Sequence, residues 1–152
     1  MLVKVWLPVR PISHLERECY PSTESKKPDL ISHSMLRERA ERAQNGRSRN
    51  YIAKIDECEV GFLCYEDWSD QKNGFIYEIL VLPEYRGQGV GYSLLAYSEA
   101  LAKSLCCTSI RLEPHPFDRT IDSSWLVSWY IRQGYASMPN DPRIMEKILV
   151  SS

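Results

Sequence analysis

The stretch Val81-Leu82-Pro83-Glu84-Tyr85-Arg86-Gly87-Gln88-Gly89-Val90-Gly91 joins an apolar, strand-like run to a helix-like run through a glycine-rich turn. A helix that begins at such a turn has backbone N–H groups without partners at its first residues, and these groups bind phosphate well. Glycine suits this place because a side chain would block close approach to the backbone, and because some positions there require positive φ. The stretch therefore predicts a phosphate-binding turn between a strand and a helix.

The stretch has three alternative interpretations: a P-loop, a dinucleotide-binding turn and a turn that binds no ligand. A P-loop ends in Gly-Lys-Ser or Gly-Lys-Thr, whereas Gly91 is followed by Tyr92 and Ser93. A dinucleotide fingerprint spaces its glycines G-x-G-x-x-G, whereas the spacing here is G-x-G-x-G. An ordinary glycine-rich turn that binds no ligand remains a third interpretation.

Composition indicates one ordinary globular domain over residues 1–152, with 43% hydrophobic and 26% charged residues. The net charge of −1 argues against nucleic acid or an anionic membrane as a general partner. No apolar run approaches the roughly 20 residues of a membrane span. The first residues lack the pattern of a secretion signal, so we expect a cytoplasmic protein.

Cysteine and histidine residues give no indication of a metal site. The five cysteines are odd in number and show no C-x-x-C spacing, so reduced thiols are the simplest interpretation. The three histidines lie far apart along the chain. We therefore expect no metal.

The chain reads as alternating strands and helices without a linker or a repeat. Strand patterns cover residues 1–6, 51–55, 60–65, 75–82, 108–113 and 144–150, and helical patterns cover residues 29–44, 94–105 and 123–133. Ser123 or Ser124 is a candidate cap for the last helix. The strand 75–82 is apolar on both faces, so we expect it to be central and covered on both sides.

Charged residues in three places are candidates for a role at a substrate site. Glu78 interrupts the apolar central strand, so it should meet a cation or line a cleft, because an unpaired buried carboxylate is costly. Several arginines lie in and after the first helix, but interleaved glutamates favour a solvated helix face. The acidic residues Asp67, Asp70, Glu113 and Asp118 could attract a cationic amine, although acidic loop residues are usually only solvated.

Two motifs together resemble one known family. Arg86-x-x-Gly89-x-Gly91, preceded by Val81-x-Pro83-Glu84, resembles the acyl-CoA-binding signature of the GCN5-related N-acetyltransferases (GNAT). The family's second element, a helix ending in aromatic-Tyr-x-x-x-Gly-aromatic, is matched by residues 129–135. The resemblance implies an α/β (α+β) single-domain fold. Its central mixed, mostly antiparallel, twisted sheet would be flanked by helices and splayed at the acyl-CoA cleft.

The resemblance implies a set of residues that bind acetyl-CoA. The Arg86 side chain and the backbone of Gly87, Gln88, Gly89, Val90 and Gly91 would hold the pyrophosphate. Backbone groups of Val81 and Leu82 would pair with the pantetheine arm, and one N–H there would polarise the thioester carbonyl. Many relatives carry an asparagine where this chain has Ser123, at a position that touches the cofactor.

The resemblance also implies direct transfer of an acyl group to an amine within a ternary complex, without a covalent acyl-enzyme. Tyr130 matches the helix tyrosine that protonates the leaving thiolate. The amine must lose a proton, and three candidate bases remain: Glu113 at a strand end, Glu78 on the central strand and His115 in a loop. A packing role for Tyr130 and a surface role for Glu113 are the alternatives. Leu126 stands where relatives usually carry a smaller residue. This difference argues against the substrates of one branch of the family, the ribosomal-protein acetyltransferases, as the substrates of this chain.

Three functions therefore fit the sequence. The first is an acetyl-CoA-dependent N-acetyltransferase (EC 2.3.1-type) that acts on a primary amine of a small molecule or of a protein or peptide. The second is a non-catalytic acyl-CoA-binding or regulatory module of the same fold. The third is a toxin-like acetyltransferase acting on aminoacyl-tRNA, which the neutral net charge disfavours. The sequence does not identify the acceptor, the length of the acyl group or the oligomeric state, and a homodimer is compatible with it.

Overall fold

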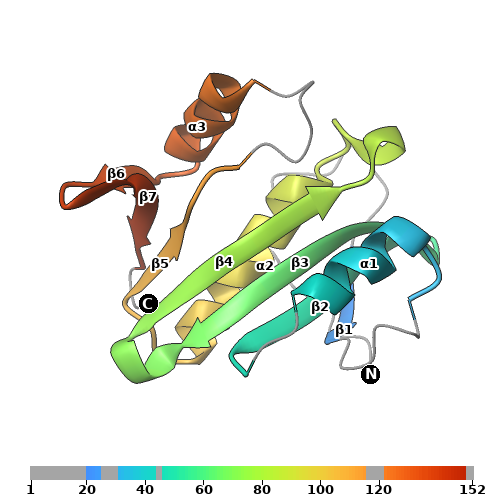
Figure 1. The fold of residues 1–152 in the computed structure, drawn as a ribbon, viewed down its shortest axis with the longest axis horizontal. Coiled ribbons are helices and arrows are strands. Elements are labelled where there is room, and N and C mark those ends of the chain that lie inside the picture. Colours follow the sequence, from blue (N-terminus) through green and yellow to red (C-terminus); the bar gives the residue numbers. More distant parts are fainter. Residues whose placement is uncertain (1–19, 25–30, 44–45, 116–121, 150–152) are drawn as a thin grey trace.

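The structure is a computed structural model that describes residues 20–24, 31–43, 46–115 and 122–149. A seven-stranded sheet with the strand order β1-β2-β3-β4-β5-β7-β6 forms its centre (Figure 1). The strands are β1 (Tyr20–Glu24), β2 (Ser48–Ile55), β3 (Cys58–Trp68), β4 (Asn73–Val81), β5 (Ser109–Leu112), β6 (Ala136–Met138) and β7 (Asp141–Ile148). The helices are α1 (Ser34–Arg42), α2 (Val90–Ser104) and α3 (Ser123–Arg132), with short 3-10 helices η2 (Ser69–Gln71) and η3 (Pro83–Tyr85).

The sheet is mixed and mostly antiparallel. Its one parallel pair is β4–β5, and the other five neighbouring pairs are antiparallel. A parallel pair needs a crossover between its strands, and α2 supplies it. The predicted fold class, a mixed sheet flanked by helices, is confirmed.

Helices cover both faces of the sheet, and each face has its own apolar core. Behind the sheet in Figure 1, α2 packs on β3 and β4 through a buried cluster that includes Leu94, Leu63 and Ile76. In front, α1 lies over β2 and β3 through a second cluster that includes Leu36 and Phe62. The two clusters take alternate residues of the same strands, as the period of two in a strand requires.

Carboxylates from outside the helices fix the starts of α1 and α3. The Glu59 side chain accepts hydrogen bonds from the backbone N–H of Ser32 (3.1 Å) and of His33 (2.6 Å), just before α1. Asp122 accepts from the backbone N–H and the hydroxyl of Ser124 at the start of α3, both at 2.9 Å. The predicted cap at Ser123 or Ser124 is therefore wrong by one or two residues, because the aspartate carboxylate already bonds both groups of Ser124.

Other predicted elements differ in extent. β4 is central, but it is not covered along its whole length, since Tyr77 is 57% exposed. The last strand begins at Asp141 rather than at residue 144. The segment 69–71 forms the helix η2, and β4 begins at Asn73, two residues before the predicted start at Phe75. The strand predicted at residues 1–6 and most of the loop after His115 lie outside the described residues.

Candidate active site

The glycine turn between β4 and α2 is open to solvent and has the backbone shape that only glycine adopts easily. Gly87 has φ +80° and Gly89 has φ +84°. No heavy atom lies within 4 Å of the place where a Cβ would stand on either residue. The turn therefore needs glycine for its backbone conformation, and it leaves free space beside the backbone for a ligand.

Helix α2 begins directly at this turn, with Gly89 as its first flanking residue. The first hydrogen bond into the helix runs from the Ser93 N–H to the Gly89 carbonyl, at 3.0 Å. The N–H groups of Val90, Gly91 and Tyr92 precede this bond and have no earlier helical turn to bind. The turn thus presents N–H groups and the positive end of the α2 dipole to an anion.

The end of β4 beside the turn lacks a strand partner on one edge. The β4–β5 ladder joins Asn73–Ile76 to Ser109–Leu112 and stops there. β4 continues to Val81 along β3 alone, so its other edge from Tyr77 to Val81 has no partner strand within the described residues. This edge offers backbone N–H and C=O groups to an extended ligand.

Val81 and Leu82 differ in what their backbone offers. The Leu82 N–H donates to the Val60 carbonyl at 2.9 Å, so it already has an acceptor within the protein. Because successive N–H groups of a strand point to opposite edges, the Val81 N–H points away from β3, toward the unpaired edge. Of the two residues, Val81 is therefore the one whose N–H faces the unpaired edge, and the pairing of both residues with the pantetheine arm stays a prediction.

A β-bulge interrupts the pairing of β4 with β3 next to Glu78. Glu78 pairs with Cys64 and Ile76 pairs with Tyr65, which leaves Tyr77 as an extra residue on β4. Ile76 and Ile79 pack in the cluster on the α2 side. Glu78 contacts Arg39 of α1, and the exposed Tyr77 ring is absent from the α2-side core. Glu78 therefore lies on the α1 side, and the bulge leaves the exposed Tyr77 without a partner residue on β3.

Glu78 is a half-buried carboxylate with a cation beside it, as its position on the central strand predicts. Its Oε1 atom lies 3.4 Å from Nη1 of Arg39, and its side chain is 18% exposed. Burial raises the pKa of Glu78 from its ordinary value, while the positive charges of Arg39 and Arg42 act in the opposite direction. A raised pKa brings a carboxylate closer to the range in which it accepts a proton from an amine effectively.

Tyr130 lies on α3 and is 7% exposed. Its ring makes edge contacts with Trp129 (5.0 Å between centroids) and Tyr135 (5.8 Å). Burial raises the pKa of Tyr130 to about 12, so the phenol keeps its proton throughout the neutral range. Packing fixes this hydroxyl as a possible proton donor.

Glu113 and His115 form a pair of their own after β5. The His115 Nε2 atom lies 3.3 Å from Oε1 of Glu113, and their side chains are 72% and 34% exposed. Glu113 is therefore more accessible to water than Glu78. No described contact joins Glu78, Glu113 and Tyr130 directly, and Ser123 is exposed in the first turn of α3.

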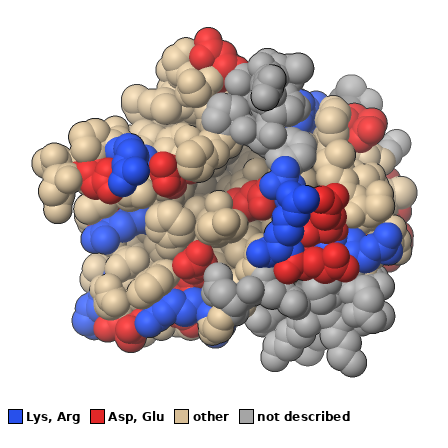
Figure 2. All heavy atoms as spheres, in the orientation of Figure 1, with Lys and Arg blue, Asp and Glu red and all other residues tan. Residues whose placement is uncertain are grey.

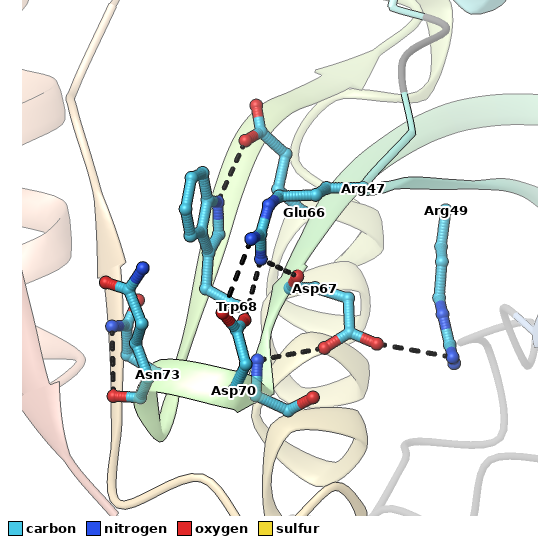
Figure 3. A network of polar contacts seen from close by, with 9 residues as sticks. Arg47, Arg49, Glu66, Asp67, Trp68, Asp70 and Asn73 are labelled. Carbon is cyan, nitrogen blue, oxygen red and sulfur yellow. Dashed lines mark hydrogen bonds and ion pairs between the residues drawn. The ribbon is translucent and has the colours of Figure 1, made fainter.

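Two acidic loop residues that could have attracted an amine are instead paired with arginines. At the start of β4, opposite to the glycine turn, Arg47 binds Asp70 at 2.7 Å and stacks 3.7 Å above the Trp68 ring (Figure 3). Arg49 lies 3.3 Å from Asp67 in the same network. The two arginines and the two aspartates line a polar hollow of about 680 Å³. The ion pairs neutralise both carboxylates, so this network is a link between β2 and the β3–β4 turn.

Within the described part of the chain, no group of three or more histidine, cysteine or acidic residues is placed to bind a metal ion. Cys58, Cys64, Cys106 and Cys107 are free thiols. No described helix combines the length and the hydropathy needed to cross a membrane.

Comparison with known proteins identifies the family. Residues 9–121 match the model of the acetyltransferase (GNAT) family, which covers more than half of the chain. The chain belongs to the GNAT family. No curated protein sequence matches it. As a GNAT protein it is an acyltransferase with an acyl-CoA-binding fold, which confirms the resemblance seen in the sequence.

Solved GNAT structures share the fold. Tetrahymena GCN5 matches with a TM-score of 0.59 and 11% identity, over 81% of this chain and 79% of that one. PaiA N-acetyltransferase from Thermoplasma acidophilum, solved with coenzyme A, matches at 0.56 and 22%, over 75% and 67%. A Klebsiella pneumoniae protein named as a candidate acyl-CoA N-acyltransferase matches at 0.56 and 26%, over 68% and 74%.

The structure adds two residues to the site that sequence reasoning did not single out. Arg39 belongs to a run of arginines whose alternation with glutamates suggested only a solvated face. That interpretation fits Arg42, which pairs with Glu38 on the helix surface, but not Arg39. Tyr77 carries no sequence signal, because a bulge depends on the register between two strands.

Proposed function

We propose that the protein transfers an acetyl group from acetyl-CoA directly to a primary amine within a ternary complex. The observation that carries this proposal is the open glycine turn at the start of α2, next to the unpaired edge of β4. Acetyl-CoA carries a pyrophosphate and an extended arm that contains amide groups. The turn suits the pyrophosphate and the unpaired strand edge suits the arm, so the two features must lie side by side. Acetyl-CoA would supply an activated acyl carbon there, in a thioester.

The chain's residues would divide the binding as follows. Backbone N–H groups from Gly87 to Gly91 and the Arg86 side chain hold the pyrophosphate. Backbone groups of Val81 hold the pantetheine arm, and the Val81 N–H polarises the thioester carbonyl. Ser123, exposed at the start of α3, is a further contact. The divergence of β4 from β5 beyond Ile76 stays a prediction.

Two side chains would move the protons. Glu78 accepts a proton from the ammonium group, since an amine attacks only when uncharged. Its burial, its raised pKa and its place on the uncovered part of β4 favour it over Glu113, whose carboxylate is more accessible and faces His115. The Tyr130 hydroxyl donates its proton to the departing thiolate, and the resulting phenolate takes up the proton that the attacking nitrogen loses as the amide forms.

Titration calorimetry with acetyl-CoA, alongside desulfo-CoA and NAD, tests the binding step. We expect both CoA compounds to bind and NAD to give no heat. Release of the CoA thiol in the presence of a broad panel of amines then tests the transfer. Binding without release in any member of the panel would support the non-catalytic module, and salt-sensitive binding of tRNA would support the tRNA-modifying alternative.

A further inference from the structure

Glu78 and Arg39 meet where α1 borders an open part of the sheet. In Figure 1, α1 lies over β2 and β3, whereas β4 and β5 are seen directly between α1 and α3. Figure 2 shows charges of both signs gathered over α1, beside a largely uncharged centre of this face. The proposed base therefore stands on β4 beside α1, and the cation that faces it comes from that helix.

Helix α1 is fixed to the sheet independently of Glu78. Leu36 and Ala40 are fully buried in the cluster that α1 shares with β2 and β3. The carbonyl of Ala40 accepts a hydrogen bond from Nδ2 of the buried Asn50 on β2, at 3.5 Å. The Glu59 carboxylate of β3 holds the residues just before the helix. The backbone that carries Arg39 therefore has a rigid support on the sheet.

Arg39 is held in place within the protein. Its Nη1 atom lies 3.4 Å from Oε1 of Glu78, and its side chain is 31% exposed. It has a further interaction besides this ion pair. A residue with more than one interaction on a fixed helix keeps a defined position, so Arg39 is able to fix the side chain of Glu78 in turn.

Among the described residues, Arg39 is the main charged neighbour of Glu78. From α1, Arg42 also acts on this carboxylate, but its guanidinium is paired with Glu38 at 2.5 Å and its side chain is 66% exposed. From β3, Cys64 is the residue opposite Glu78, and burial raises the pKa of its thiol to about 12, so the thiol is uncharged at neutral pH. The ladder between β4 and β5 ends before Glu78.

We infer that Arg39 is a positioning residue for the proposed acetyl transfer, because it holds the Glu78 carboxylate in place and ionised to accept a proton from the ammonium group of the acceptor. This inference rests on the proposed function and gives α1 a role in it. A glutamate side chain without a partner rotates about several bonds, and an ion pair to a fixed helix removes much of this freedom. Arg39 acts only through Glu78.

A double-mutant cycle tests whether Arg39 acts through Glu78. Arg39→Gln, Glu78→Gln and the double variant of the full-length protein are compared in kcat/KM at neutral pH, with saturating acetyl-CoA and the most reactive amine of the panel. Arg39→Gln alone should lower kcat/KM roughly 10- to 100-fold, because the base is displaced and is protonated more readily. In the Glu78→Gln background, the same change should alter kcat/KM by less than about twofold.

Two matched variants separate this role from a purely structural one. Arg39→Lys should recover part of the loss and return the acid limb of the pH–rate profile toward its wild-type position, because the charge is kept and only the planar fork is lost. Arg42→Gln removes an equal charge from the exposed side of α1 and should leave kcat/KM within about twofold. The affinity for desulfo-CoA, measured by calorimetry, should be unchanged in every variant, which a disrupted fold would not allow.

The cycle also distinguishes failure of this inference from failure of the proposed function. If Glu78→Gln lowers kcat/KM but Arg39→Gln does not, Glu78 is the base without help from Arg39, and the inference is wrong. A loss in Arg39→Gln that persists at full size in the Glu78→Gln background overturns it as well. If the wild type releases no thiol with any amine of the panel, the proposed transfer itself is wrong, and the role of Arg39 is overturned with it.

Discussion

The hydroxyl of Tyr65 occupies the space in which Gly74 would carry a side chain. Tyr65 is fully buried on β3, and a Cβ built on Gly74 of β4 would overlap its hydroxyl and ring edge. The contact lies in the α2-side core, close to the place where β4 pairs with β5. Gly74 is therefore required by packing and not by its backbone angles.

Gly74→Ala should destabilise the protein by about 2 kcal/mol or more, because the ring of Tyr65 cannot move within a filled core. Chemical unfolding monitored by tryptophan fluorescence measures this. Gly46→Ala is the matched control, since no atom lies within 4 Å of its added Cβ. A change in the control as large as that in Gly74→Ala would contradict the packing argument.

Gly89→Ala should weaken acetyl-CoA binding at least tenfold while the core stays intact. The positive φ of Gly89 costs an alanine roughly 1–2 kcal/mol, and the added methyl group enters the space proposed for the pyrophosphate. Calorimetric titration gives the affinity, and thermal unfolding gives the stability. Gly91 has no positive φ, and its added Cβ would only touch Val81 at 3.7 Å, so Gly91→Ala should lose less stability. Unchanged affinity in Gly89→Ala would place the pyrophosphate elsewhere.

Tyr130→Phe should lower kcat roughly 10²- to 10⁴-fold, the range of general acid catalysis, with little change in the affinity for acetyl-CoA. The edge contacts of the ring with Trp129 and Tyr135 remain in the variant, so the helix should keep its packing. Steady-state kinetics and calorimetry measure the two effects separately. A variant that turns over normally but binds acetyl-CoA weakly would exclude the acid role.

Glu78→Gln should abolish the acid limb of the pH–rate profile, whereas Glu113→Gln should leave it in place. The base must be ionised, and burial raises the pKa of Glu78, so kcat/KM should rise with pH at a value above that of an ordinary glutamate. Arg39→Gln should move this limb further upward, since Arg39 lowers that pKa. If the profile instead changes only in Glu113→Gln, the base is Glu113.

The raised pKa of Glu78 also predicts how the stability of the protein depends on pH. The pKa of Glu78 is higher in the folded than in the unfolded protein, so the folded state binds more protons between these two values. The contribution of Glu78 to stability therefore falls as pH rises through that interval. The urea concentration at the unfolding midpoint is measured at several mildly acidic pH values. As pH rises, this midpoint should fall less in Glu78→Gln than in the wild type.

Local sequence was sufficient to predict the order of most elements and the glycine turn between β4 and α2. The glycines at 87 and 89 predicted a turn with positive φ because few other residues adopt it. Helical spacing predicted α1 and α2, since one apolar face suffices to mark a helix. Predicted boundaries were less accurate where another side chain competes for the hydrogen bonds at a helix end. At the start of α3, the Asp122 carboxylate, one residue before the predicted cap, accepts a hydrogen bond from the N–H of Ser124.

The sequence by itself therefore determined the family, the glycine turn before α2 and the position of Tyr130 on its helix, because each depends on residues close together in the chain. Tertiary structure alone decided the surroundings of Glu78. The bulge beside Glu78 depends on the register of β4 against β3, and the Arg39 contact depends on how α1 crosses the sheet. The same register joins the Leu82 N–H to the Val60 carbonyl, so that the Val81 N–H points to the other edge of β4. Such pairings join residues far apart in the chain, so no local pattern contains them.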